Sequence, residues 1–285
     1  MKTIAIFTII LLTALSTFSQ HAQPATALTK LWETLPGLKI PESVLYDPTS
    51  GIVYVSNIDG NPSEKDKSGF ISTLSPEGKI LKADWVTGLD APKGMGLLKN
   101  HLFVTNIDEV VEIDINTAAI VKRYPVAGSK FLNDIAIDTK TGKVFITDSG
   151  NGQVYTLSDG KVSLWQQGPM FKGSNGLCMT DNALFIGASG NIVKADLNSG
   201  EAVIWIPDTG GVDGLFVTSD DKFIYSDWKG SVFIAGKNQE PELLLNTSAE
   251  KVNAADFGVI ASRNMILIPT FMDNKVVGYS SRLIK

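Results

Sequence analysis

Residues 133–158, NDIAIDTKTGKVFITDSGNGQVYTLS, contain three short apolar segments separated by polar residues. The first segment begins at Asn133, the second spans residues 143–148, and the third spans residues 153–158. β-Branched and aromatic residues dominate all three, and the Thr-Lys-Thr-Gly segment at 139–142 has the composition of a tight reversal. This stretch therefore predicts consecutive antiparallel strands.

The same pattern recurs along the chain. After a longer first unit, the first strands of successive units start 38 to 42 residues apart. Each unit ends with two weaker strands. The six first strands begin at Glu42, Gly94, Asn133, Asn175, Asp213 and Asn253. The six second strands read IVYVSN, HLFVTN, KVFITD, ALFIGA, FIYSD and MILIPT. Helical periodicity is absent, so the repeat decides the fold.

Six units of four strands predict an all-β fold, a six-bladed β-propeller of four-stranded antiparallel blades. Seven blades of about 40 residues would need about 280 residues, more than remain after the N-terminal segment described next. A β-sandwich would not show this repeat. We expect a single propeller domain over residues 23–285, with a hydrophobic content of 44% that is sufficient for a sizeable core.

Residues 1–22 have the layout of a secretory signal peptide. Lys2 precedes an apolar run from Ile4 to Leu15, and a region of small and polar residues follows, with cleavage expected near Ser19 to Ala22. The apolar run is too short to cross a bilayer as a helix. We therefore expect an exported protein, periplasmic or secreted, with no membrane contact after cleavage. An N-terminal anchor left in place is the alternative.

The charge and the cysteine content narrow the function classes. The net charge is −5 and no basic stripe occurs, which argues against a nucleic-acid partner. Cys178 is the only cysteine, so an internal disulfide is excluded and the fold must rely on its core.

Propeller topology predicts where polar side chains converge. The starts of first strands and the ends of second strands share one face of the central channel. Oxygen donors dominate these positions, which include Glu42, Asn133, Asn175 and Asp213 at the starts. With no His or Cys among them, this set favours calcium, with magnesium and then zinc as alternatives. Two alternative interpretations of these residues are turn dipeptides that join the blades and a water-filled channel without a metal.

Further residues are candidates for the substrate pocket on the same face. They are Asn57, Asn106, Phe131, Asp148 and Trp228, with Asp256 and Phe271 as weaker candidates. For Asp148 and Asp256 a role in turns or between blades is equally good, and for the aromatic residues packing between blades is the alternative. The insertion at residues 57–70 follows a second strand and predicts either a lid over this face or a solvated surface loop.

At these residues the sequence resembles the senescence marker protein/gluconolactonase family, which includes regucalcin. The resemblance spans residues 40–275, and its motifs match Glu42, the Asn-Asp at 133, the Asn-Gly at 175 and the Asp-Gly at 213. It implies a six-bladed, calcium-dependent propeller that hydrolyses lactones, with these four residues as metal ligands. The family often carries arginine where Phe131 stands, so we expect a more apolar lactone or ester than a sugar acid.

The residue content limits the chemistry. Only His21 and His101 occur, which excludes a histidine dyad in the channel and a Ser-His-Asp triad. Metal catalysis remains, with Asp213 as ligand and base or nucleophile and Asn133 as ligand or substrate-positioning residue. The alternatives are a non-catalytic exported propeller that binds a ligand or protein, and a protein in which calcium has only a structural role.

Overall fold

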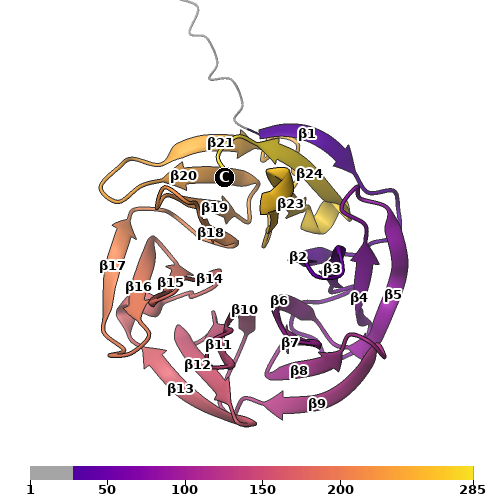
Figure 1. Cartoon of the computed structure of the whole chain (residues 1–285), viewed down its shortest axis with the longest axis horizontal. Coiled ribbons are helices and arrows are strands. Elements are labelled where there is room, and N and C mark those ends of the chain that lie inside the picture. The colour runs from indigo at the N-terminus through magenta and orange to yellow at the C-terminus, as the bar shows by residue number, and fades with distance from the viewer. Residues whose placement is uncertain (1–27, 285) are drawn as a thin grey trace, which may run out of the picture.

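The computed structural model describes residues 28–284, and they form six four-stranded antiparallel sheets arranged in a ring around a central channel (Figure 1). The predicted all-β, six-bladed propeller is confirmed. The expected signal peptide, residues 1–22, lies outside the described residues. Among residues 28–284 the helical elements are three 3₁₀ turns, Pro169–Phe171, Ala261–Arg263 and Phe271–Asp273. This part of the chain contains no helix long and apolar enough to span a membrane.

The strands are described by their position in a blade, from the channel outward. The innermost strands are β2 (Pro41–Asp47), β6 (Pro92–Leu98), β10 (Leu132–Asp138), β14 (Leu177–Met179), β18 (Leu215–Val217) and β22 (Gly258–Ile260). The second strands are β3 (Ile52–Asn57), β7 (His101–Asn106), β11 (Lys143–Asp148), β15 (Ala183–Ala188), β19 (Phe223–Asp227) and β23 (Met265–Pro269).

The outer half of each blade completes the sheet. The third strands are β4 (Gly69–Leu74), β8 (Glu109–Asp114), β12 (Gln153–Ser158), β16 (Asn191–Asp196), β20 (Ser231–Ala235) and β24 (Val276–Ser281). The outermost strands are β5 (Ile80–Leu89), β9 (Ala119–Pro125), β13 (Lys161–Gln167), β17 (Ala202–Pro207), β21 (Glu242–Asn246) and β1 (Leu28–Glu33).

The ring closes by joining the two ends of the chain. Strand β1 pairs antiparallel with β24, so the N-terminal strand is the outermost strand of the last blade. The repeat did not reveal this strand, because its pairing partner lies at the far end of the sequence. Closure leaves neither the first nor the last blade alone.

The core lies between neighbouring blades. One buried cluster joins Phe103 of β7 to Leu132 and Ile135 of β10, and comparable clusters fill the other blade interfaces. The second strands are almost completely buried, as their apolar sequences predict. Each interface uses both neighbours, which explains why four-stranded units of this sequence need a ring.

The innermost strands differ in length from what the repeat predicts. Strand β22 has only three residues and begins five residues after Asn253, and strands β14 and β18 have three residues each and begin two residues after Asn175 and Asp213. Gly176 explains the close approach of these two segments, because a Cβ atom there would lie 2.0 Å from the backbone oxygen of Asp213. The segments therefore lie close enough together to place both site residues at one mouth of the channel.

Candidate functional site

Irregular pairing turns three innermost strands toward the channel at their second residue. The register between β2 and β3 shifts between Pro41 and Ser43, and the pairs β6 with β7 and β10 with β11 shift at the same place. The second residues of these strands, Glu42, Lys93 and Asn133, lie within the shifted segments. A bulge re-aims a side chain that regular pleating would place in the sheet face, so three blades present comparable positions to the channel.

These positions line a cavity of about 270 Å³ at the mouth of the channel. Its polar lining consists of Glu42, Lys93, Asn133, Asn175 and Asp213. Its apolar walls are Ile58, Pro62, Phe131, Trp228 and Phe271. The structure thus brings together the four predicted metal ligands, which come from four different blades.

The two carboxyl groups of the cavity are almost fully buried, with Glu42 and Asp213 each 5% exposed. Burial and the neighbouring charge of Asp213 raise the pKa of Glu42 well above its usual value, against a lowering effect of Lys93. Burial, together with the charge of Asp256, raises the pKa of Asp213 to about 8. Two buried carboxylates at one mouth repel each other, so a cation between them would restore their ionised forms.

The two amides are oriented by hydrogen bonds on their nitrogen side. Asn133 Nδ2 donates to Ser149 Oγ at 3.1 Å, and Asn175 Nδ2 donates to Asp213 Oδ1 at 2.9 Å. Hydroxyl groups of the preceding blades hold the backbone of the same residues. Thr105 Oγ1 donates to the Asn133 carbonyl at 2.5 Å, and Thr147 Oγ1 donates to the Asn175 carbonyl at 2.9 Å. The amide oxygens are thereby left for a ligand.

Two of the cavity oxygens lack any hydrogen-bond partner. Glu42 Oε2 and Asn175 Oδ1 are buried and accept no hydrogen bond. A buried polar atom without a partner costs about 1–3 kcal/mol, and native proteins contain few of them. Among residues 28–284, no group of three or more His, Cys, Asp or Glu side chains is placed to hold a metal. The donor set of two carboxylates and two amides contains only oxygen and fits a hard cation such as calcium.

The sequence reasoning missed Lys93, whose side chain is 1% exposed and lines the cavity. Lys93 Nζ donates to the carbonyl oxygens of Pro62 at 3.1 Å and Ala91 at 3.0 Å, and it lies 4.3 Å from the centroid of the Phe131 ring. Burial lowers the pKa of Lys93 to about 8, against the opposing effect of Glu42. A signal was present, because Pro92-Lys93 stands in the same position of its blade as Pro41-Glu42.

The predicted pocket residues divide into two groups. Phe131 and Trp228 line the cavity, and Phe271 packs edge-on against Trp228 with ring centroids 5.5 Å apart. The side chains of Asn57, Asn106 and Asp148 are not part of the cavity lining and hold backbone instead.

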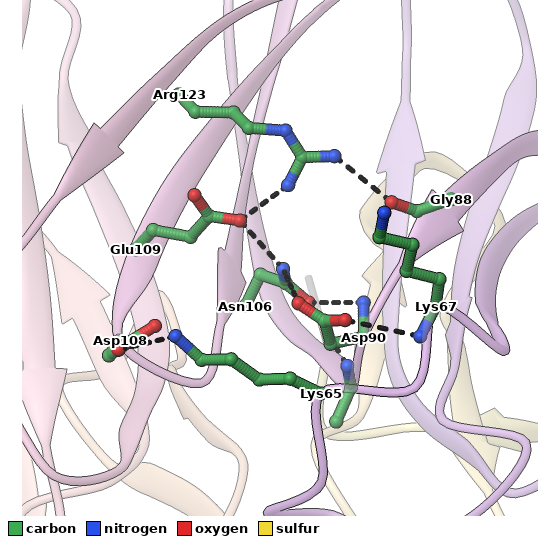
Figure 2. Close-up of polar contacts among 9 residues, drawn as sticks. Lys65, Lys67, Gly88, Asp90, Asn106, Asp108, Glu109 and Arg123 are labelled. Atoms are coloured by element: carbon green, nitrogen blue, oxygen red, sulfur yellow. Dashed lines mark hydrogen bonds and ion pairs between the residues drawn. The ribbon is translucent and has the colours of Figure 1, made fainter.

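The contacts of the second group explain its burial. Asn57 Oδ1 accepts from Lys39 N at 3.0 Å, and Asn106 Oδ1 accepts from Asp90 N at 2.9 Å and Ala91 N at 3.0 Å. Figure 2 shows Asn106 within a polar network of neighbouring loops. The carboxylate of Asp148 accepts backbone N–H groups from its own turn and from residues 130 and 131. These residues shape the loops around the cavity.

The insertion after β3 reaches the cavity. Ile58 and Pro62 supply part of its wall. Lys65 Nζ forms an ion pair with Asp108 at 2.6 Å, and Lys67 N donates to Asp90 Oδ1 at 3.1 Å, so the far side of the loop is attached to the second blade (Figure 2). The loop thus lies over one side of the cavity, in the position that the lid reading requires.

Asp256 lies further along the channel with Asp134. They line a second cavity of about 230 Å³ formed by the bodies of the innermost strands. Asp134 accepts from Ile135 N and Leu177 N, each at 2.6 Å, and Asp256 accepts from the Ser43 hydroxyl. Burial raises the pKa of Asp134 to about 7 and that of Asp256 well above its usual value.

Comparisons with known proteins identify related propeller structures. No family model and no curated protein matches the sequence. Among solved structures, a protein provisionally named a gluconolactonase superposes with a TM-score of 0.65 at 14% identity, covering 92% of this chain and 94% of the other.

Two further structures have different names. A catalytically inactive virginiamycin B lyase from Staphylococcus aureus, solved with quinupristin, gives a TM-score of 0.62 at 14% identity, over 89% of this chain and 98% of the lyase. The WD40 β-propeller domain of Doa1 gives 0.60 at 13% identity, over 84% of this chain and 77% of that chain. At these identities the likeness shows a shared propeller fold, which a gluconolactonase-type protein, a lyase and a WD40 domain all have.

Proposed function

We propose that the protein is a metal-dependent hydrolase of a small lactone or ester, with one calcium ion held by Glu42, Asn133, Asn175 and Asp213. One observation carries this proposal: Glu42 Oε2 and Asn175 Oδ1 are buried without partners in a cavity that Asn133 and Asp213 also line. The structural likeness to a gluconolactonase-type propeller supports it. The more specific resemblance to the regucalcin-like family belongs to the same proposal.

The bound cation would supply polarisation of the scissile carbonyl. Residues of the chain transfer the proton and orient the ligands. Asp213 Oδ1 accepts the hydrogen bond from Asn175, which leaves Oδ2 to take a proton from the attacking water. The water oxygen adds to the acyl carbon, the acyl C–O bond breaks, and the proton passes from Asp213 to the departing alkoxide oxygen. The Ser149 contact holds Asn133 in the orientation that presents its oxygen.

The walls of the cavity favour a substrate with an apolar body. Phe131, Trp228 and Phe271 limit the water around the reacting group, and they come from three different blades or loops. A cavity of about 270 Å³ is slightly smaller than the usual small-molecule site, for which the range begins at about 300 Å³. The substrate is therefore small.

Lyase chemistry of the kind named for the structural neighbour finds no support in this cavity. The inactive form of that lyase has a histidine replaced by alanine. His101 is the only histidine in residues 28–284, and it pairs with Glu112 at 2.8 Å and does not line the cavity.

The test combines metal binding with turnover. Metal-stripped protein is melted alone and with calcium, magnesium or zinc, and the same samples are assayed on small lactones and aryl esters. We expect calcium to raise the melting temperature and to be required for hydrolysis. In Asp213→Ala, turnover should fall by at least about 100-fold, because this variant loses both ligand and base.

The outcomes separate the readings. Full activity of Asp213→Ala overturns the assignment of this residue. Calcium binding without hydrolysis of any substrate in the panel supports the alternative, a non-catalytic propeller that binds a ligand or protein partner. The absence of any metal effect overturns the site. Export to the periplasm or the medium is a separate proposal, tested by fractionating cells that produce the full chain.

A further inference from the structure

Lys93 is a buried cation whose hydrogen-bonding capacity is not exhausted. Its ammonium group has three protons, and the carbonyls of Pro62 and Ala91 accept two of them. Among residues 28–284, no carboxylate oxygen lies within 4.0 Å of Nζ in an ion pair. Glu42 acts on Lys93 only through space. One donor of Lys93 is thus available inside the cavity that it lines.

Contacts with three different segments of the chain hold the Lys93 side chain in position. The Pro62 carbonyl belongs to the insertion after β3, the Ala91 carbonyl precedes β6, and the Phe131 ring lies 4.3 Å from Nζ in a cation–π contact. A long flexible side chain held in this way has already lost its rotamer freedom, so a ligand would meet a preorganised ammonium group.

The charged groups that line the cavity would have a net positive charge when a divalent cation is bound. Glu42 and Asp213 carry two negative charges when a divalent cation is bound, and the cation and Lys93 together carry three positive charges. One net positive charge would then remain among apolar walls, and an uncompensated buried charge is costly. Asp134 and Asp256 line the neighbouring cavity, where backbone N–H groups and the Ser43 hydroxyl donate hydrogen bonds to them, and the charge of Asp256 acts on Asp213 from there without contact to Lys93.

We propose that Lys93 is the specificity-determining residue of the cavity, and that the substrate is a lactone or ester that carries a free carboxylate. This inference rests on the proposed function. A carboxylate has the single negative charge that balances the site, whereas a phosphate carries about two near neutral pH. Lys93 binds the carboxylate of the substrate, and a cation held by Glu42, Asn133, Asn175 and Asp213 would polarise the scissile carbonyl. The apolar walls contact the carbon skeleton between these two groups.

The experiment uses a pair of probes that differ in one charge and cannot be hydrolysed as lactones. They are the lactam 5-oxopyrrolidine-2-carboxylate and its uncharged carboxamide. Each is titrated calorimetrically into calcium-loaded protein, and calcium is titrated separately into metal-stripped protein. We expect wild-type protein to prefer the carboxylate by about 10- to 100-fold, the range that one hydrogen bond to a charged group supplies.

Lys93→Met is expected to have opposite effects on the two ligands. It should lose the preference for the carboxylate, and it should bind calcium at least as tightly as wild type, because a like charge beside the site is removed. A residue with a merely structural role would weaken both. Lys122→Met is the matched control, since Lys122 also lies over an aromatic ring, at 4.6 Å from Tyr124, but on an outermost strand. It should behave as wild type.

The outcomes distinguish the two proposals. Wild-type protein that binds no calcium overturns the proposed function. Wild-type protein that binds calcium but takes both probes equally, or neither, overturns the role of Lys93 alone. Retention of the carboxylate preference in Lys93→Met does the same. If Lys93→Met fails to fold, Lys93→Arg replaces it as the variant, because it keeps the positive charge and should keep the preference for the carboxylate. The comparison of the two probes on wild-type protein then still decides whether the cavity selects a carboxylate.

Discussion

Replacing Glu42 by glutamine removes one buried charge without changing the shape of the side chain. In the metal-free protein, Glu42 Oε2 has no hydrogen-bond partner, and burial and Asp213 both disfavour the charged form. Glutamine is neutral at every pH, so the variant avoids the cost of burying this charge or of holding a proton that the unfolded chain has released, about 1.4 kcal/mol per pH unit between the folded and unfolded pKa values. In a domain of this size the melting temperature changes by about 2–4 °C per kcal/mol. Relief of about 2 kcal/mol should therefore raise the melting temperature of metal-free Glu42→Gln by about 4–8 °C.

The assay is thermal unfolding of metal-stripped protein, repeated at a series of calcium concentrations. Wild-type protein should gain stability with calcium, by about 2.7 kcal/mol when calcium is 100-fold above its dissociation constant. Glu42→Gln should start from a higher melting temperature and gain little, because the site has lost one of two charged ligands. A ligand residue is thus recognised by opposite effects on the metal-free and the metal-loaded protein.

Asp148→Asn is the matched control for this experiment. Asp148 is also a fully buried acid, but its carboxylate accepts hydrogen bonds from Lys130 N and Phe131 N and from its own turn. This variant should lose about 1–3 kcal/mol and keep the full gain with calcium. If Glu42→Gln instead behaves like Asp148→Asn, destabilised when metal-free and still stabilised by calcium, then Glu42 is a structural acid and the reasoning is refuted.

Two further predictions concern pH and packing. The pKa of Asp213 is raised to about 8 and that of Asp134 to about 7. The folded metal-free protein therefore keeps protons on these groups that the unfolded chain has released above about pH 4. Its melting temperature should fall by at least about 2 °C between pH 5 and pH 8. Calcium should stabilise more at pH 8 than at pH 5, since it competes with those protons, and a flat profile in both states would show that these carboxyls titrate normally. Gly176→Ala places a methyl group 2.0 Å from the Asp213 carbonyl oxygen and should lower the melting temperature by about 4–8 °C, for about 2 kcal/mol of overpacking, and weaken calcium binding. Gly211→Ala, where a Cβ meets nothing within 4 Å, is its control, and equal melting temperatures for the two variants would contradict the proposed close approach.

The repeat predicted the strands best where burial is most uniform. The second strands of the first five blades have the bounds that their sequences predict, because each is an apolar run between turn residues. Innermost strands β14 and β18 are shorter than predicted. Their first residues are shaped by contact with the neighbouring blade through Gly176, and a pattern read along one strand does not contain that neighbour.

The candidate site was partly accessible from the sequence. Glu42, Asn133, Asn175 and Asp213 stand at comparable points of four repeats, so the topology alone brought them to one mouth, and the structure places all four around one cavity. Their role as metal ligands stays a prediction. The sequence pattern does not identify Lys93, because the repeat predicts a strand start at Gly94 and because a lysine is ordinarily a surface residue.

The amino-acid sequence by itself determined the number of blades and which oxygen-bearing side chains stand at comparable points of four repeats, since repeats, turns and residue types are local properties of the chain. Only the tertiary structure decided which polar residues face the cavity and which hold backbone, as Asn106 and Asp148 do. It also decided that strand β1 closes the ring and that Lys93 adds a positive charge beside Phe131. These features depend on bulges and on contacts between distant blades, and such contacts exist only once the ring has closed.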